Sequence, residues 1–192
     1  MNPLGAMHTP PLAIRFLGTN GWYDSETGNT VCTLISAPEA VVVLDAGYGL
    51  AKLDRYLPAN DERPVFLLLS HFHLDHVVGL HTLGKFKLHG GLTLGCPTGG
   101  RAVLRTLVNR PFTIPLDDLP YPARSCELPG EASRLPFPVQ VLPLRHVGLT
   151  LGYRLNLGGR VIAYLPDTGY CANAVTLARS ADLLIAECAF KP

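Results

Sequence analysis

The sequence predicts an α+β protein in which β-sheets pack face to face and carry helices on their outer faces. Short apolar runs rich in β-branched residues recur along the chain, bounded by glycine, proline or asparagine, which is typical of strands. Some of these runs, such as residues 41–44 and 66–69, are apolar throughout, so we expect them to be buried on both faces. Segments with the apolar spacing of a helix are fewer. Together these observations favour a sandwich of sheets flanked by helices.

The predicted elements follow one another without an internal repeat. The strand candidates, in chain order, are residues 12–17, 30–36, 41–45, 65–69, 92–94, 139–142, 150–155, 161–165 and 183–186. The helix candidates are residues 50–56, 76–83, 100–109 and 172–180. Residues 111–138 contain seven prolines, which predict an irregular segment. This segment is either a surface connection or a wall of the substrate cleft, because loops often carry recognition.

Length and composition favour one folded domain. The chain has 192 residues, of which 47% are apolar and 16% charged, enough apolar residues for a buried core and too little charge for disorder. The net charge of +1 gives no overall field that would attract nucleic acid or an anionic membrane.

The cysteines and the N-terminus predict a cytoplasmic protein. Five cysteines are scattered without C-x-x-C spacing, which indicates free thiols in a reducing compartment. Residues 1–11 lack the basic start and apolar core of a secretory signal, and we expect them to form an irregular leader. No apolar run has the length needed to span a bilayer.

The most informative motif is the segment 71–76, His-Phe-His-Leu-Asp-His, which lies where a predicted buried strand ends and a predicted helix begins. His71 and His73 are two residues apart, so in an extended segment they point the same way and can hold one ion together. Asp75 and His76 follow at the turn, which suits a second, adjacent ion. Imidazole nitrogen and carboxylate oxygen are ligands of zinc-like ions. The alternative is a chance cluster of histidines in a surface loop.

Two later residues extend this metal site. His146 follows the strand predicted at 139–142, and Asp167 follows the strand predicted at 161–165. A single histidine or aspartate after a strand is usually a loop or capping residue. Here the upstream motif requires further ligands, and we therefore interpret both residues as metal ligands.

On these residues the chain resembles the metallo-β-lactamase fold superfamily of hydrolases. The segment 71–76 matches the superfamily signature H-x-H-x-D-H, and His146 and Asp167-Thr168 match the next two ligand motifs. Phe16-Leu17-Gly18-Thr19 resembles the opening strand and turn, and Leu44-Asp45-Ala46-Gly47 resembles a segment whose aspartate supports the ligands. The resemblance implies a four-layer αββα sandwich with two metal ions at one edge of the sheets.

The resemblance also implies a role for each site residue. His71, His73 and His146 would hold the first ion, Asp75 and His76 the second, and Asp167 would bridge the two. Asp75 and Asp167 are the catalytic candidates. Asp167 would bridge the two ions, and Asp75 would also orient the attacking water or accept its proton. Asp45 would hydrogen-bond a ligand histidine, or else belongs to a simple turn after a strand. Glu187 resembles a glutamate of the tRNA-processing branch, or else is an edge charge.

The chain departs from the superfamily pattern at its end. The superfamily supplies one more histidine to the second metal after a further strand, whereas no histidine follows Asp167 here. His8, His81 and His89 lie in unsuitable contexts. We expect a missing C-terminal part, or else a second site that is incomplete or is completed by another group, and we favour the missing part. The predicted organisation is thus the leader, residues 1–11, and a single metallo-hydrolase domain, residues 12–192, that lacks its C-terminal part.

The predicted function is hydrolysis of a small phosphodiester, such as a cyclic nucleotide or a ribosyl cyclic phosphate. An aspartate at the bridging position is typical of the phosphodiesterases of the superfamily. Residues 17–21 and 182–187 also resemble the tRNA 3′-endonuclease branch. However, only residues 147–166 separate the ligand histidine from the bridging aspartate, which leaves no room for the long arm of the tRNA enzymes.

Three alternative functions remain open on the sequence. They are a tRNA 3′-processing endonuclease, another hydrolase of this fold (a lactonase, thioesterase or β-lactamase), and an inactive truncated metal-binding scaffold. The predicted cofactors are two divalent ions, zinc in the first place, with manganese or iron as alternatives. The predicted partner is the small phosphodiester itself. Nucleic acid is not favoured, no membrane partner is expected, and a homodimer is left open.

Overall fold

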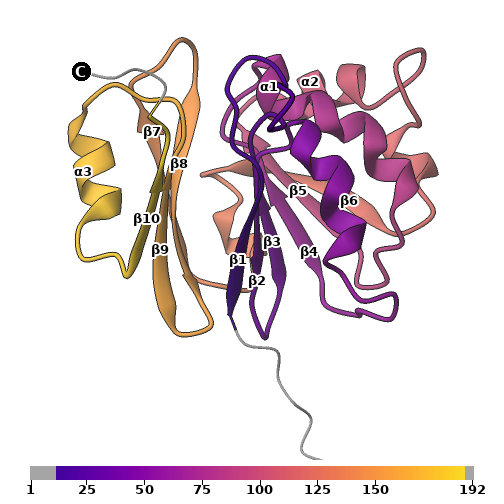
Figure 1. Cartoon of the computed structure of the whole chain (residues 1–192), viewed down its shortest axis with the longest axis horizontal. Coiled ribbons are helices and arrows are strands. Elements are labelled where there is room, and N and C mark those ends of the chain that lie inside the picture. Colours follow the sequence, from indigo (N-terminus) through magenta and orange to yellow (C-terminus); the bar gives the residue numbers. More distant parts are fainter. Residues whose placement is uncertain (1–11, 189–192) are drawn as a thin grey trace, which may run out of the picture.

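The computed structural model describes residues 12–188, so the predicted leader and residues 189–192 lie outside the described part. Two β-sheets lie face to face, and helical segments cover the outer face of each sheet (Figure 1). The order of the layers is helix, sheet, sheet, helix. This is the αββα arrangement that the sequence predicts.

The larger sheet contains six strands that follow the order of the chain. They are β1 (Ala13–Gly18), β2 (Cys32–Ser36), β3 (Val41–Leu44), β4 (Val65–Leu68), β5 (Leu92–Pro97) and β6 (Ala123–Leu128). β1 to β3 pair antiparallel, whereas β3 to β6 pair in parallel. Every residue of β3 and β4 is buried, because the second sheet covers one face and helical segments cover the other.

The smaller sheet contains four strands in the order β10-β9-β8-β7. They are β7 (Val139–Leu144), β8 (Thr150–Leu157), β9 (Arg160–Leu165) and β10 (Leu183–Ala186). β7 to β9 form an antiparallel meander, and the chain then returns through α3 (Ala172–Ala178) so that β10 pairs parallel to β9. β9 and β10 therefore end at the same edge of the sheet.

Apolar side chains fill the space between the two sheets and the space beneath the outer helices. Between the sheets, Phe66 and Leu68 of β4 pack in one cluster with Tyr153, Leu155 and Ile162 of the smaller sheet. A second cluster lies between the larger sheet and the helical segments η1 (Tyr48–Arg55), α1 (Leu74–Val77), η2 (Val78–Lys85) and α2 (Gly100–Leu107). A third lies under α3. None of the helices within residues 12–188 is long and apolar enough to cross a bilayer.

The helix predicted at 76–83 is divided in the structure. The four-residue α-helix α1 is followed directly by the 3₁₀ segment η2. Gly79 donates its N–H to the carbonyl oxygen of Ala46 at 2.8 Å, and a Cβ at this position would collide with the carbonyl oxygen of Gly47. The segment thus passes directly against the turn after β3, and this close approach requires glycine.

The proline-rich segment 111–138 is more ordered than the sequence predicts. It contains the short 3₁₀ segments η3 (Leu116–Asp118) and η4 (Ala132–Arg134), and between them the strand β6, which the sequence analysis missed. β6 is flanked by Pro122 and Pro129, and among residues 12–188 it pairs only with β5. Proline is tolerated at the ends of an edge strand, because no ladder hydrogen bond is lost there. The prolines therefore concealed a real strand.

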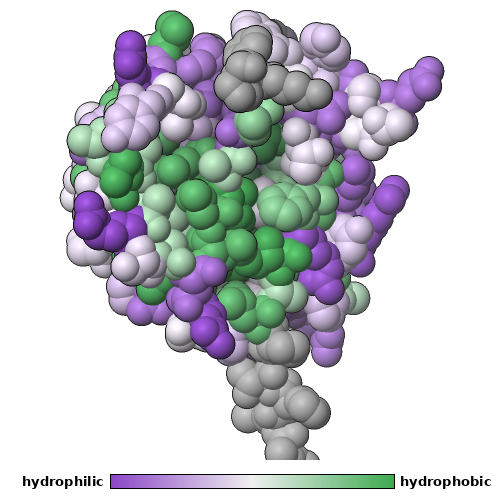
Figure 2. Space-filling model, turned by 60° about the vertical axis from the view of Figure 1, so that its left-hand side comes forward, coloured by the Kyte–Doolittle hydropathy of each residue, from purple (hydrophilic) through white to green (hydrophobic). Residues whose placement is uncertain are grey.

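The strands β1 and β10 are the outer strands of their sheets, and they line a common groove that reaches His76 and Glu187. Apolar side chains gather on this face of the molecule (Figure 2). Phe16, Leu183 and Leu184 are among the exposed apolar residues of these two strands. Within residues 12–188, this face thus combines two unpaired strand edges with an apolar surface.

Candidate metal centre

The predicted ligands meet at one edge of the two sheets. Asp45 follows β3 and His71 lies shortly after β4, and these two strands run parallel and side by side. Asp167 and Glu187 follow the parallel strands β9 and β10 in the same way. His146 comes from the loop after β7. Because the carboxyl ends of parallel strands meet at one edge, separate segments deliver polar side chains to one place.

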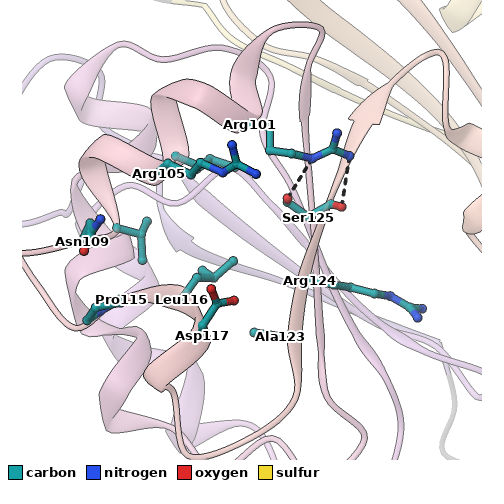
Figure 3. Close-up of a pocket in the computed structure, with 11 residues that line it drawn as sticks. Arg101, Arg105, Asn109, Pro115, Leu116, Asp117, Ala123, Arg124 and Ser125 are labelled. Atoms are coloured by element: carbon teal, nitrogen blue, oxygen red, sulfur yellow. Dashed lines mark hydrogen bonds between the residues drawn. The ribbon is translucent and has the colours of Figure 1, made fainter.

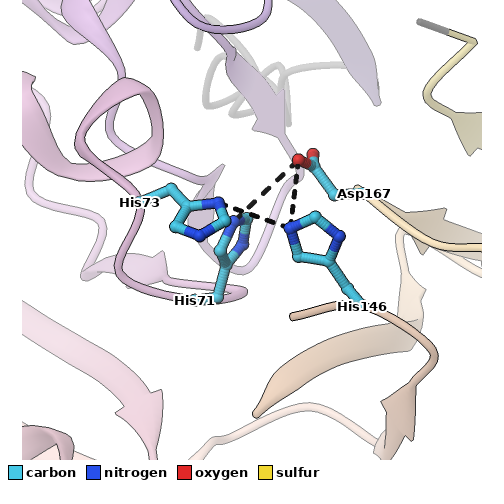
Figure 4. Close-up of side chains that lie close together, drawn as sticks. All are labelled: His71, His73, His146 and Asp167. Atoms are coloured by element: carbon cyan, nitrogen blue, oxygen red, sulfur yellow. Dashed lines mark hydrogen bonds and ion pairs between the residues drawn. The ribbon is translucent and has the colours of Figure 1, made fainter. Parts of the chain in front are cut away.

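The first group, named here the histidine cluster, consists of His71, His73, His146 and Asp167, whose ligand atoms all lie within 4.8 Å of one another (Figure 4). Asp167 Oδ2 lies 3.5 Å from His146 Nε2 and 4.0 Å from His71 Nε2. His146 Nε2 lies 3.3 Å from His73 Nδ1. Ligands of one tetrahedral zinc ion are about 3.4 Å apart, so these spacings suit a single ion.

The second group, named here the carboxylate cluster, consists of His76, Asp167 and Glu187. His76 Nε2 lies 3.1 Å from Asp167 Oδ1, so the two oxygens of Asp167 face different clusters. Asp75 lies beside this group, with its Oδ2 3.7 Å from His76 Nε2. The same oxygen accepts the backbone N–H of Trp22 at 2.7 Å. The structure thus places Asp75 at the rim of the cluster, and its role as a ligand stays a prediction.

Asp45 is fully buried behind both clusters and accepts several hydrogen bonds. The backbone N–H of Ser70 donates to Oδ1 at 2.7 Å, and the Ser70 hydroxyl donates to Oδ2 at 2.8 Å. The hydroxyl of Tyr164 also donates to Oδ2, at 2.6 Å. His76 Nδ1 lies 2.9 Å from the same oxygen. This is the geometry of a carboxylate that fixes the orientation of a metal-binding histidine.

The same network determines which nitrogen of His71 faces the histidine cluster. The single proton of the Ser70 hydroxyl goes to Asp45, so Ser70 Oγ accepts a bond from His71 Nδ1, 2.9 Å away. His71 Nε2 then carries a lone pair, and it is buried without a hydrogen-bond partner among the described residues. A buried lone pair among other ligand atoms is satisfied by a cation. The residues present therefore fit a divalent metal ion.

The two histidines nearest to Asp45 differ in their electrostatics. Burial, followed by the charge of His76, lowers the pKa of His71 to about 4, so this imidazole is neutral near pH 7, as a metal ligand must be. Burial alone would lower the pKa of His76. The carboxylates of Asp45 and Asp167 outweigh that effect and raise the pKa of His76 to about 10.

The two carboxyl groups of the carboxylate cluster share a proton. Desolvation, followed by the hydrogen bond with Asp167, raises the pKa of Glu187 to about 8. Desolvation would also raise the pKa of Asp167, but hydrogen bonds with His76 and Glu187 hold it well below its ordinary value. The proton of the pair therefore resides on Glu187 at neutral pH, and a metal ion at this cluster would have to displace it.

Several residues of the site go beyond the sequence analysis, among them Ser70, whose hydroxyl lies between Asp45 and His71. Glu187 is expected there only as a supporting residue, whereas its carboxylate lies within the carboxylate cluster. Tyr164, whose hydroxyl contacts Asp45, was not expected at all. The only available signal was a tyrosine within the otherwise apolar run of residues 161–165.

A separate hollow of about 190 Å³ lies between α2 and the η3–β6 segment (Figure 3). Arg105 projects into it and Asp117 lies on the opposite side (Figure 3). Arg101 donates hydrogen bonds to the side chains of Ser125 and Glu131. The volume is below the ~300 Å³ of ordinary small-molecule sites. No residue of either cluster lines it, so this part of the proline-rich segment forms no wall of the candidate metal centre.

Sequence comparisons find relatives for nearly the whole chain. A family described as "Beta-lactamase superfamily domain" matches residues 41–192. The probable metallo-hydrolase YhfI of Bacillus subtilis is 25% identical over 186 residues, which cover 93% of this chain and 73% of that protein. Ribonuclease Z of Pyrococcus abyssi is 23% identical over 235 residues, which cover 93% of this chain and 75% of that protein.

Solved structures show the same fold. The crystal structure of B. subtilis YhfI superposes with a TM-score of 0.74 at 22% identity and covers 94% of this chain and 73% of its own. The short form of human tRNase Z gives a TM-score of 0.67 at 22% identity, covering 89% of this chain and 75% of its own. The fold and the resemblance expected from the sequence are thus confirmed. Since the family match spans residues 41–192, this chain belongs to the β-lactamase superfamily and is one of its metallo-hydrolases.

Proposed function

We propose that this metallo-hydrolase is a phosphodiesterase that acts on a small phosphodiester with two divalent ions. The observation that carries the proposal is the position of Asp167, with Oδ2 toward the histidine cluster and Oδ1 toward the carboxylate cluster. A carboxylate shared in this way holds two hard cations close together, and such a pair matches the oxygens of a phosphate group.

In this proposal each cluster holds one ion. His71, His73 and His146 would hold the first ion, His76, Asp75 and Glu187 would hold the second, and Asp167 would serve both. When bound, such a pair of ions would lower the pKa of a water molecule and would stabilise negative charge on the phosphate oxygens. The nitrogen-rich histidine cluster favours zinc, and manganese or iron are the alternatives.

The protein's own groups orient this chemistry. Asp45 and Ser70 hold His76 and His71 in the ring orientations that direct Nε2 toward the clusters. Asp75 lies at the rim of the carboxylate cluster, where it would accept the proton of the attacking water. Among the solved structures similar to this chain is a diphosphatase from the PhnP family, with a TM-score of 0.62 at 16% identity. That similarity supports the fold, and the substrate class rests on Asp167.

The test compares two chromogenic substrates, bis(p-nitrophenyl) phosphate and a cephalosporin, with the zinc-loaded protein. We expect the diester to be hydrolysed and the cephalosporin to remain intact. The Asp75→Ala variant should lose most of the turnover while it keeps its fold by circular dichroism. Efficient cleavage of the cephalosporin without cleavage of the diester would overturn the proposal. If neither is cleaved although both ions bind, an inactive scaffold becomes the better description.

A second candidate is tRNA 3′-end processing, favoured by the similarity to ribonuclease Z of P. abyssi at 23% identity. Two features speak against it. Residues 147–166, where the tRNA enzymes carry their long arm, consist mostly of β8 and β9 and leave no room for such an arm. The net charge of +1 also offers little attraction to an RNA backbone. We therefore expect a precursor tRNA with a 3′ trailer to remain uncut under conditions in which the small diester is hydrolysed. Cleavage at the trailer would reverse this ranking.

The buried cysteines support a cytoplasmic location, which we also propose. Cys32, Cys96 and Cys126 are buried as free thiols, and such thiols are typical of proteins in a reducing compartment. Fractionation of cells that produce the protein would test this directly.

A further inference from the structure

The loop between β1 and β2 presents an exposed aromatic ring beside the histidine cluster. Trp22 is 78% exposed. Its indole lies nearly parallel to the imidazole of His73, with 19° between the planes and 6.3 Å between the ring centroids. Trp22 is the only tryptophan of the chain. A large flat surface is thus open to solvent next to a predicted metal ligand.

Trp22 is held in this position at a cost in free energy. Its backbone adopts the left-handed region, with φ of 62°, which is unfavourable for a bulky residue. The backbone N–H of Trp22 donates to Asp75 Oδ2 at 2.7 Å, so a residue of the metal centre anchors the main chain that carries the indole. Because the Trp22 indole is mostly exposed, burial of this side chain contributes little to the stability of the fold. Strain and exposure at the same residue, beside a candidate active site, are typical of ligand contacts.

The rest of the loop is ordered by its own hydrogen bonds. Asp24 Oδ1 accepts the backbone N–H of Thr30 at 2.6 Å. The side-chain amide of Asn20 donates to Ser25 Oγ at 2.8 Å and to the carbonyl oxygen of Gly28 at 3.0 Å. The main chain that carries Trp22 is therefore ordered before any ligand arrives, which lowers the entropy lost on binding.

We propose that Trp22 is the platform on which a nucleobase of the substrate stacks while the phosphate lies over the two clusters. The proposal rests on the proposed phosphodiesterase function and narrows its substrate to diesters that carry a nucleobase, such as cyclic nucleotides. Every nucleobase offers a flat π face, and stacking on an aromatic side chain strengthens binding by about tenfold or more. Because the indole lies beside His73, a base stacked on it would lie next to a phosphate held over the two clusters.

The experiment compares two ligands that share a phosphate and differ in the base, adenosine 5′-monophosphate and ribose 5-phosphate. Zinc-loaded protein is titrated with each by calorimetry, and the fluorescence of Trp22 is followed in parallel. We expect adenosine 5′-monophosphate to bind about tenfold more tightly and to quench the indole, whereas ribose 5-phosphate leaves the emission unchanged.

Variants separate stacking from a structural role of the loop. Trp22→Leu should reduce the affinity for adenosine 5′-monophosphate to the level measured for ribose 5-phosphate. The affinity for ribose 5-phosphate should be the same in the variant and in the unmodified protein. Trp22→Phe should keep most of the preference for the base. Tyr56→Leu is the matched control, because Tyr56 is a partly exposed aromatic residue that packs on Arg15 and contacts neither cluster, and it should change nothing.

Equal affinity for the two ligands in the unmodified protein would overturn the platform, as would a Trp22→Leu variant that weakens both ligands alike. The two proposals also fail separately. If bis(p-nitrophenyl) phosphate is hydrolysed but the base confers no preference, the phosphodiesterase stands without the platform. If the base is preferred but no diester is hydrolysed, the platform stands and the phosphodiesterase is wrong.

Discussion

The histidine cluster and the carboxylate cluster share Asp167 but differ in the atoms that they offer to a metal ion. The histidine cluster offers three imidazoles and one carboxylate, and its His71 is 3% exposed. The carboxylate cluster offers one imidazole and two carboxyl groups, and one of these, Glu187, is exposed and carries a proton at neutral pH. Because a proton must leave before the metal binds, we expect the histidine cluster to hold its ion more tightly.

Removal of the shared residue, Asp167, should have the largest effect, because it belongs to both clusters. Asp167→Ala takes one ligand from each cluster and leaves the cations without a common carboxylate. We expect hydrolysis of the chromogenic diester to fall by ~10³-fold or more, which corresponds to several kcal/mol of lost transition-state stabilisation. Initial rates and metal content after gel filtration would measure this. A variant that keeps two equivalents of metal would contradict the shared position of Asp167.

Removal of one imidazole should affect the histidine cluster alone. His146→Ala leaves His71, His73 and Asp167, and we expect roughly one equivalent of zinc fewer by elemental analysis. The control is His81→Ala, because His81 is an exposed histidine of η2 outside both clusters. Equal metal content in the two variants would show that His146 is not a ligand.

Substitution of Asp45, which lies behind both clusters, should have a smaller effect on metal binding. Asp45→Asn keeps the shape of the side chain but removes its negative charge beside His76. It also replaces one acceptor oxygen with an NH₂ donor, so not all of the present hydrogen bonds can form. Loss of such a supporting carboxylate typically weakens metal binding by ~10- to 100-fold. Competition titrations with a chromophoric chelator would give the affinities. An unchanged affinity would assign Asp45 a structural role only.

The smallest effect should come from Glu187, the exposed member of the carboxylate cluster. Glu187→Gln keeps the shape of the side chain and removes the negative charge of one exposed proposed ligand, while His76, Asp75 and Asp167 stay in place, so we expect only a few-fold change in turnover of the diester. When a chelator is added, we expect two phases of metal release, a fast one from the carboxylate cluster and a slow one from the histidine cluster. Glu187→Gln should accelerate the fast phase and leave the slow phase unchanged. If Glu187→Gln accelerates release of the slow metal, the assignment of clusters to metals is reversed.

The parts of the structure that sequence periodicity and motif spacing determine were predictable. The apolar runs correspond to nine of the strands, and the His71-to-His76 segment lies at the end of β4 as expected. β6 was not predictable, because its flanking prolines and its polar residues Arg124 and Glu127 conceal an edge strand. The division of the helix at 76–83 depends on the approach of Gly79 to the turn after β3, which local sequence does not show.

The composition of the site depends on long-range strand pairing. Glu187 reaches Asp167 only because β10 pairs in parallel with β9 and ends level with it. Tyr164 reaches Asp45 only because β9 faces the larger sheet across the core. Neither contact has a signal in the spacing of residues along the chain. Motif spacing therefore indicated which histidines and aspartates come together, and their role as ligands stays a prediction. The contacts of Glu187 and Tyr164 required the tertiary structure.

The hydrogen bond between Tyr164 and Asp45 has a consequence for the order of folding. Asp45 and Ser70 follow strands of the larger sheet, whereas Tyr164 belongs to the smaller sheet. His146 and Asp167 also arrive from the smaller sheet, so neither half of the chain contains a complete histidine cluster. We expect metal affinity to appear only after the two sheets have docked. In a refolding experiment, uptake of zinc would therefore report the docking step rather than the formation of either sheet.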